Sequence, residues 1–313
     1  VSEDLLYSVP VPAEAGATNG TVTMNAATME NTGLEFALAW HDYGHDLKYD
    51  ISANVTLPKN KVTSLGMGET SRVDGFTKTM VGSEVGQFYG YVYEGIFQSQ
   101  EEIDNSATIP GTIAKPGDIK YKDLNGDGKI TYDQDRGYVA GNGYPKFTAG
   151  LNLGLNWKGI DFSMNWVTGI GRTVALTGVY SGGIMDHTAM TRPFYHGGNS
   201  PVYLVENSWR EDNRDARFPR LSVSPTNNNA FSSTWWYEDG SYLRLKSLQL
   251  GYNLPKAWTQ KAGFGGVRVY FEGNNLLTVS KLMKYNIDPE TPGVSNGYYP
   301  QQRLMGIGLE IQF

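Results

Sequence analysis

The chain has 313 residues, no cysteine and a formal net charge of −6. Without cysteine it can form neither a disulfide framework nor a cysteine-ligated zinc site, and its mild acidity is unlike the basic face that a nucleic-acid partner requires. An apolar share of 40% and an aromatic share of 12% are sufficient for a folded protein. No apolar run approaches the roughly 20 residues of a membrane-spanning helix, but a transmembrane β-strand needs only about 9–11 residues with one apolar face.

Apolar and polar residues alternate along much of the chain, which is typical of β-strands with two unlike faces. Residues 2–8 are expected to be the end of one strand, and residues 242–254 form another whose change of phase predicts a β-bulge near Ser247. Only residues 255–264 have a helical spacing. The remaining strands are expected at residues 34–40, 47–57, 147–157, 160–166, 267–271 and 305–313, so the chain is expected to be all-β with about eight antiparallel strands.

The connections between these strands alternate in length. Residues 41–46, 158–159 and 254–266 form the short ones, and residues 58–146, 171–240 and 276–302 form the long ones. Outer-membrane β-barrels have this asymmetry, with short periplasmic turns and long extracellular loops. Trp40, Trp157 and Tyr252 at strand ends are suited to an interfacial aromatic girdle. The alternative is a soluble β-sandwich, such as a surface-attached glycan-binding β-domain without transport activity.

Several longer stretches are similar to one known family. They are LLYSVPVP (5–12), NAATMENTGLEFAL (25–38), GDIKYKDLNGDGKI (117–130), PKFTAGLNLGLNWKGIDFSMNW (145–166), EDGSYLRLKSLQLGYNLP (238–255), VRVYFEGNNLLT (267–278) and GIGLEIQF (306–313). In this order they resemble the C-terminal part of SusC/RagA-type TonB-dependent outer-membrane transporters, which are found in Bacteroidetes.

The resemblance implies that residues 1–313 are the last strands of a 22-stranded transmembrane β-barrel, whose plug domain and N-terminal strands are not in this chain. It implies an active importer and not an enzyme. Such importers take up oligosaccharides or oligopeptides, work with a SusD-like surface lipoprotein, and are driven by the TonB-ExbB-ExbD complex through the missing N-terminal part. Outer-membrane lipid would surround the barrel, and polar strand residues would line its lumen: Lys48, Asp50, Asn54, Asn152, Asn156, Asn165, Arg268, Glu272 and Glu310.

One loop has the beginning of an EF-hand calcium motif. Oxygen-bearing side chains alternate at Asp123, Asn125 and Asp127, followed by Gly128 and the carbonyl of Lys129. The second half departs from the motif, because Gln134 stands where a bidentate Glu is usual. Asp133 and Asp135 are the nearest carboxylates, and we expect Asp135 to close a structural Ca²⁺ site. The alternative is a turn held by its own side-chain hydrogen bonds.

Aromatic residues in the long loops are candidates for ligand binding. Their faces, interleaved with amide and carboxylate groups, suit sugar rings and peptides. The alternative is that they pack loop against loop or join the aromatic girdle. No catalytic motif is recognisable, so no catalytic residue is predicted. The candidate ligand-binding residues are Tyr195, Trp209, Trp235, Trp236, Tyr285 and Tyr298.

Overall fold

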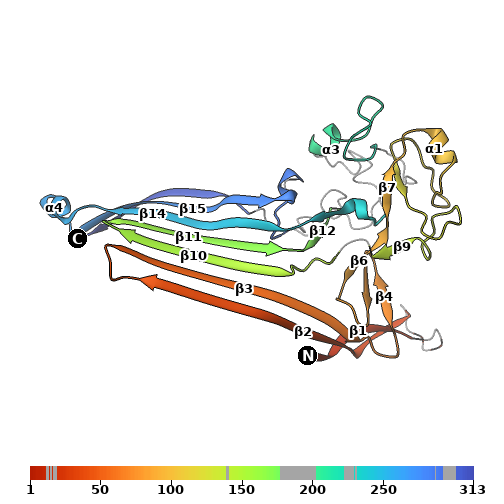
Figure 1. Cartoon of the computed structure of the whole chain (residues 1–313), viewed down its shortest axis with the longest axis horizontal. Helices are drawn as coiled ribbons and strands as arrows, with labels where there is room; N and C mark the ends of the chain where they lie inside the picture. The colour runs from red at the N-terminus through yellow and green to blue at the C-terminus, as the bar shows by residue number, and fades with distance from the viewer. Residues whose placement is uncertain are drawn as a thin grey trace.

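The computed structural model describes residues 1–11, 14, 16, 20–138, 141–176, 202–221, 229, 231–285, 287–291 and 301–313. Its main element is one antiparallel sheet of eight strands that are neighbours in chain order. Apart from the first, which pairs only with the end of the second strand, the strands run along the long axis of the molecule (Figure 1). They are β1 (Ser2–Pro10), β2 (Thr21–Asp42), β3 (Leu47–Ser64), β10 (Phe147–Trp157), β11 (Ile160–Ile170), β14 (Tyr242–Asn253), β15 (Gly266–Ser280) and β16 (Leu304–Gln312). The antiparallel all-β class expected from the sequence is confirmed.

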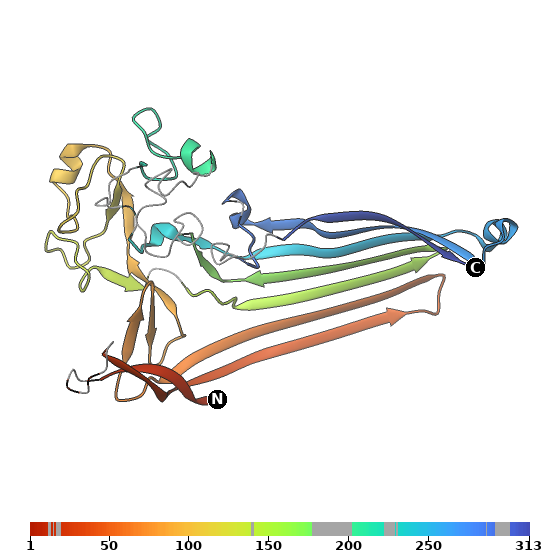
Figure 2. The ribbon, with the colours of Figure 1, turned by 180° about the vertical axis from the view of Figure 1, so that it is seen from behind.

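Short connections lie at one end of the sheet and long ones at the other, as the sequence predicted (Figure 2). Lys158 and Gly159 both have positive φ angles and form a two-residue hairpin between β10 and β11. The connection from β14 to β15 contains two short helical pieces, α4 (Lys256–Thr259) and η4 (Gln260–Ala262). Among the described residues, no helix has the length and apolar character needed to cross a membrane.

The predicted bulge in β14 is present. Asn165 of β11 pairs with Ser247, whereas Trp166 pairs with Leu245, so Lys246 is the extra residue. The pairing of β14 with β15 skips the same residue. This extra residue brings the apolar positions before and after it onto one face of the sheet.

β2 and β3 are longer than their alternation indicated. The two strands remain paired beyond Leu34 and Leu57, as far as Thr28 and Ser64. The added segments are mostly polar, so the periodic signal that marks a strand with one apolar face is absent there. They extend the sheet toward the long connections.

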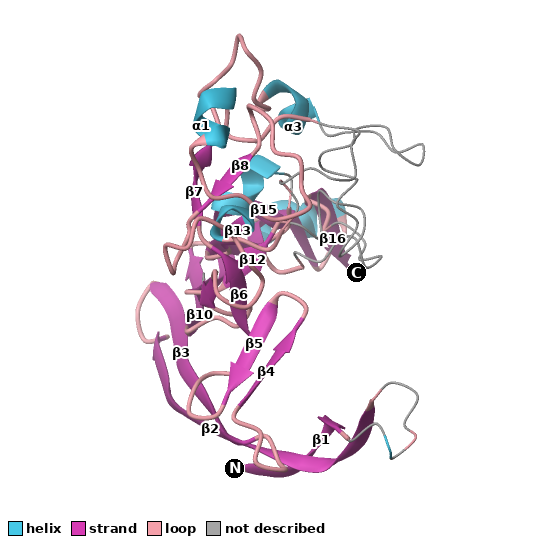
Figure 3. Cartoon of the chain, turned by 90° about the vertical axis from the view of Figure 1, so that its right-hand side faces the viewer, coloured by secondary structure: helices cyan, strands magenta, loops and turns pink. Residues whose placement is uncertain are grey.

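The described parts of the long connections fold into a second structural unit, here called the loop layer, at one end of the sheet (Figures 1 and 3). Its principal buried apolar cluster includes Ile119, Leu176, Phe218, Leu282 and Ile287. The buried apolar core therefore belongs to the loop layer and not to the long strands. The loop layer contains β4 (Ser71–Asp74), β5 (Thr77–Met80), β6 (Gln87–Tyr91), β7 (Tyr93–Ile96), α1 (Gln100–Asp104), β8 (Ile119–Tyr121), β9 (Arg136–Tyr138), β12 (Thr173–Ala175), α3 (Val202–Glu206), η3 (Thr234–Trp236), β13 (Tyr237–Asp239) and η5 (Lys281–Tyr285).

Candidate functional site

The apolar face of the eight-stranded sheet is exposed. Directly paired residues share a face, and Leu38 with Ala53 and Phe271 with Ile307 are such apolar pairs. Leu38 is 73% exposed and Ile307 is 84% exposed, and no second layer of described residues covers them. A soluble monomer rarely leaves so extended an apolar surface uncovered. A lipid bilayer would cover it, as it does on the outside of a membrane barrel.

Aromatic residues lie at the short-turn end of this apolar face. Trp40, Trp157 and Tyr252 are all exposed there. The Trp40 indole donates a hydrogen bond of 3.1 Å to the hydroxyl of Tyr49, and the Lys158 ammonium lies 5.2 Å from the centre of the Trp157 ring. Aromatic side chains with a polar tip are favoured at membrane–water interfaces. These positions fit the girdle that the sequence predicted.

The opposite face carries polar residues that are hydrogen-bonded from strand to strand. Asn165 on β11 donates through Nδ2 to Oδ1 of Asn152 on β10, at 2.6 Å. Asn152 in turn donates to the Ser52 hydroxyl on β3, at 3.2 Å. These contacts give the sheet one polar, hydrogen-bonded face, which is the arrangement expected for the lumen of a barrel.

A charged group lies on the same face, nearer to the short turns. Arg268 on β15 forms an ion pair with Asp161 on β11, and its Nη2 donates to Gln249 on β14 at 3.0 Å. Glu310 on β16 is 3.8 Å from the Arg268 guanidinium. Gly251 leaves room for the pair, because a β-carbon there would lie 2.5 Å from Oδ2 of Asp161. Four strands are thus linked by the side chain of one arginine.

Four of the predicted ligand-binding aromatics are buried in the loop layer. Trp209 is 8% exposed, Trp235 4%, Trp236 1% and Tyr285 3%. The Trp236 indole donates to the backbone carbonyl of Asn229 at 2.9 Å. These rings pack loop against loop, so in this conformation they offer no open face to a ligand. Tyr195 and Tyr298 lie outside the described residues.

A buried carboxylate, which the sequence reasoning did not single out, joins distant loop segments. Asp118 is 0% exposed, and its Oδ1 lies 2.7 Å from Nε of Arg220. Oδ1 also accepts a hydrogen bond of 2.9 Å from the Asn229 side chain. Burial raises the pKa of Asp118, although the Arg220 guanidinium and these hydrogen bonds oppose the rise. The preceding Gly117 has a φ of +90°, and a β-carbon there would overlap the Trp209 ring.

A second buried ion cluster holds the loop after β15 against the sheet. Arg244 on β14 is 2% exposed, and its Nη2 lies 2.7 Å from Asp288. Its Nη1 forms an ion pair with Glu290, which also accepts a bond of 2.7 Å from Lys246. Nε of Arg244 donates to the Thr278 hydroxyl at 2.9 Å. Alternation along β14 places Arg244 on the polar face, but its partners could not be read from the sequence.

The EF-hand-like loop is held by its own hydrogen bonds. The two carboxylate oxygens of Asp123 accept from the backbone N–H groups of Gly126 at 2.6 Å and Gly128 at 2.8 Å. Oδ1 of Asp127 accepts from the backbone N–H of Lys129 at 2.9 Å. Each carboxylate oxygen has a second lone pair, so these bonds leave capacity for a cation.

Asp135 closes the loop through backbone groups. It is 0% exposed, and it accepts from the N–H of Leu124 at 2.9 Å and the N–H of Thr131 at 2.6 Å. Burial favours the neutral acid, but these hydrogen bonds outweigh it and hold the pKa of Asp135 below its usual value. No group of three or more potential metal-ligating His, Asp or Glu side chains comes together within the described ranges. The remaining predicted positions, Asn125 and Asp133, are exposed.

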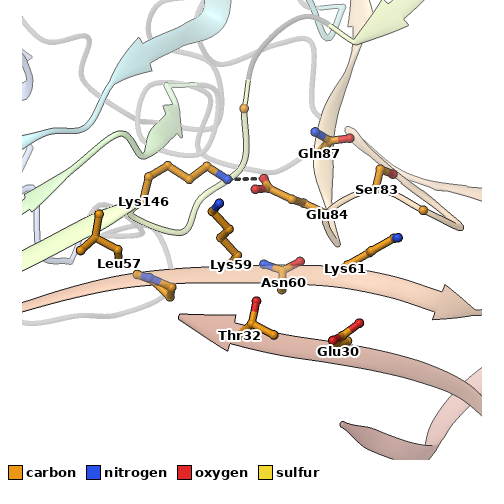
Figure 4. Close-up of a pocket in the computed structure, with 13 residues that line it drawn as sticks. Glu30, Thr32, Leu57, Lys59, Asn60, Lys61, Ser83, Glu84, Gln87 and Lys146 are labelled. Atoms are coloured by element: carbon orange, nitrogen blue, oxygen red, sulfur yellow. Dashed lines mark hydrogen bonds and ion pairs between the residues drawn. The ribbon is translucent and has the colours of Figure 1, made fainter. Parts of the chain in front are cut away.

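A pocket of about 740 Å³ lies where β3 separates from β10. The strand pairing ends at Thr56 and Thr148. Beyond it, Val62 of β3 exchanges backbone hydrogen bonds of 2.8 and 2.9 Å with the turn at Gly82 and Ser83. Figure 4 shows side chains from β2, β3 and this turn around the pocket, with lysines prominent among them. The lysines are Lys59, Lys61 and Lys146, of which Lys146 is paired with Glu84.

The whole chain is similar to known receptors of one kind. No protein-family model matches it. Over the full length of the chain, it is 30% identical to TonB-dependent receptor P3 of Formosa agariphila and 25% identical to TonB-dependent receptor SusC of Bacteroides thetaiotaomicron. A solved structure of the RagAB peptide transporter matches 99% of the chain with a TM-score of 0.68 and 26% identity. The chain spans about a third of each relative: 31%, 29% and 32% of their respective lengths.

Proposed function

We propose, on the premise that this chain is a SusC/RagA-type TonB-dependent receptor sequence, that it forms wall and outer loops of an active outer-membrane importer. The observation that carries the proposal is the reversal of the usual burial pattern. Apolar strand residues such as Leu38 and Ile307 are bare, whereas the buried core lies in the loop layer. This pattern is favourable only if lipid covers the strands and water surrounds the loops.

The sheet also needs further strands. Along the apolar face, β2 and β16 are the outermost strands, because β1 pairs with β2 only from Thr21 to Met29, beyond the apolar pairs that begin at Leu34. Each of them therefore leaves one edge without a partner strand within the described sheet at that level. An unpaired backbone polar group in lipid costs several kcal/mol. We therefore expect additional strands to pair with β2 and β16 at this level and to close a barrel, with 22 strands as the family resemblance suggests. The polar face around Arg268 would then line the lumen that surrounds the plug.

The loop layer would face the outside and receive the ligand. Its buried ion pairs at Asp118 and Arg244 hold segments far apart in the chain in fixed positions, as a docking surface requires. A SusD-like lipoprotein would lie over this layer, and the TonB complex would act through the part of the receptor that precedes these strands. The cargo would be an oligopeptide or an oligosaccharide. The RagAB relative, a peptide transporter, supports the first class.

Calcium would have a structural role in this layer. The side-chain oxygens of Asp123, Asn125 and Asp127, with the carbonyl of Lys129, would hold the ion. Asp135 would order the loop through its backbone hydrogen bonds and not as a ligand, because its side chain is fully buried whereas the Asp123 side chain is partly exposed. Bound calcium would stiffen a long outer loop and take no part in chemistry.

Membrane fractionation of the full-length receptor separates the importer from the soluble alternative. We expect the receptor in the outer-membrane fraction, soluble only with detergent, and we expect loss of the gene to abolish uptake of one labelled oligopeptide or oligosaccharide. A receptor that is recovered in aqueous buffer without detergent would support the glycan-binding domain and would overturn the importer.

A further inference from the structure

Two lysines stand directly above the apolar stripe of β3, on the same face. Paired residues share a face, and Leu57 pairs with Leu34 at the upper end of the stripe. Two residues further, Lys59 pairs with Thr32, and two residues beyond that, Lys61 pairs with Glu30. Because side chains on one face recur every second residue, Lys59 and Lys61 continue the outward face of β3 and do not point into the lumen.

The length of the stripe places these lysines just outside the hydrocarbon. The stripe on β3 runs from Leu47 to Leu57. Ten residue steps of about 3.3 Å give roughly 33 Å along the strand, and a tilt of about 40° reduces this to roughly 25 Å along the membrane normal. The apolar band of an outer-membrane barrel is about 25 Å tall. Lys59 and Lys61 would therefore lie at the level of the lipid headgroups.

The two ammonium groups are available to an anion. Both lysines are exposed, and neither has a carboxylate within ion-pair distance among the described residues, although Glu30 stands opposite Lys61 in the strand register. Lys146, the third lysine of the pocket, is already neutralised by Glu84. The pocket is large enough for a phosphorylated sugar, and further polar side chains line it: Thr32, Asn60, Ser83 and Gln87.

The pattern recurs at the other end of the sheet. On β16 the outward positions are Met305, Ile307, Leu309 and Ile311, and Arg303 immediately precedes the strand, two residues before Met305. Arg303 is exposed and has no ion pair with any described residue. β3 and β16 are five places apart in the strand order, so the two occurrences are independent. By contrast, Lys281 above the stripe of β15 is 3.4 Å from Asp239.

We propose that Lys59 and Lys61, with Arg303 at a second position, bind the phosphate groups of lipid headgroups in the outer leaflet. The proposal rests on the membrane placement argued above. It concerns the surface that faces lipid and not the path of the cargo. A soluble anionic ligand is disfavoured because the lysines lie on the outward face, directly above residues that would be in hydrocarbon.

The test is a binding titration of the full-length receptor in detergent with phosphorylated lipid A, with dephosphorylated lipid A, and with inorganic phosphate. The double variant Lys59→Gln/Lys61→Gln is compared with Lys48→Gln, which removes a lysine from the lumen face of the same strand. We expect the double variant to bind phosphorylated lipid A about 30-fold more weakly and Lys48→Gln to change binding less than about twofold. Dephosphorylated lipid A should bind wild type at least as weakly as the double variant binds the phosphorylated form, because Arg303 also loses its phosphate partner. Arg303→Gln should weaken binding of phosphorylated lipid A about fivefold.

Unchanged lipid A binding by the double variant would overturn the proposal. A loss of inorganic phosphate binding equal to the loss of lipid A binding would also overturn it, in favour of a soluble anion site. Heat-modifiable migration on gels checks that each variant is folded. Fractionation of wild type separates this inference from the proposed function. If the receptor is found in the outer membrane but its lipid A binding does not depend on Lys59 and Lys61, the inference is refuted and the proposed function is not.

Discussion

Replacement of Leu38 by arginine tests whether the bare apolar face contacts lipid. Leu38 pairs with Ala53, which lies one residue from the middle of the stripe between Leu47 and Leu57. It therefore lies within about 3.3 Å of the centre of the apolar band. The adjacent Ala39 pairs with Ser52 at the same depth but on the polar face. Leu38→Arg and Ala39→Arg thus differ chiefly in the face that receives the charge.

The expected costs of the two substitutions are far apart. An arginine that faces lipid at the bilayer midplane costs about 2–4 kcal/mol, which corresponds to a roughly 30- to 700-fold shift in the unfolding equilibrium. An arginine that faces the aqueous lumen should change the free energy of unfolding by less than about 0.5 kcal/mol. If the face were merely an exposed surface of a soluble protein, Leu38→Arg would change the free energy of unfolding as little as Ala39→Arg.

The measurement is guanidinium unfolding of the full-length receptor from phospholipid vesicles, followed by heat-modifiable gel migration. Wild type, Leu38→Arg and Ala39→Arg are compared under the same conditions. A Leu38→Arg receptor as stable as the Ala39→Arg receptor would refute the lipid-facing assignment of the whole apolar face, and with it the importer.

Three further predictions concern the loop layer. Gly117→Ala should make the loops cleavable by trypsin, because the new β-carbon would overlap the Trp209 ring at a backbone φ of +90°; an unchanged digestion pattern would show that the glycine is not needed there. The pKa of Asp135 is held below its unfolded value of about 3.9, so its stabilising effect is present at neutral pH and is lost as the pH falls below about 4. Below this pH, the Leu124 and Thr131 amides should be less protected from hydrogen exchange. Equal protection factors at pH values of about 3 and about 6 would contradict this. Calcium should slow proteolysis of residues 123–135, and a chelator should restore the original rate. If the rate of cleavage does not depend on calcium, the loop is a turn held only by its own hydrogen bonds.

The sequence by itself determined the class of fold and which side chains of each strand lie on the apolar face. Alternation along residues 147–157 and 305–313 is a local property of the chain, and it identifies which side chains share a face before any partner strand is known. The phase change in residues 242–254 predicted the bulge for the same reason, and Lys246 is the extra residue. Polar segments such as the beginning of β2 gave no such signal, because they carry no continuous row of apolar residues on one face.

Only the tertiary structure decided what the loop residues do. Trp209, Trp235 and Trp236 were candidates for ligand binding, but they are buried. The Trp209 indole, for example, donates a hydrogen bond to Gln98, which is 111 residues away in the chain. Asp118 meets Asn229 across 111 residues, and no periodicity reports a contact of that range. Whether a loop residue is buried depends on which distant segments pack against it. Whether a strand residue is apolar or polar depends on whether its face contacts lipid or water. For this reason the long strands could be predicted from local patterning and the loop layer could not.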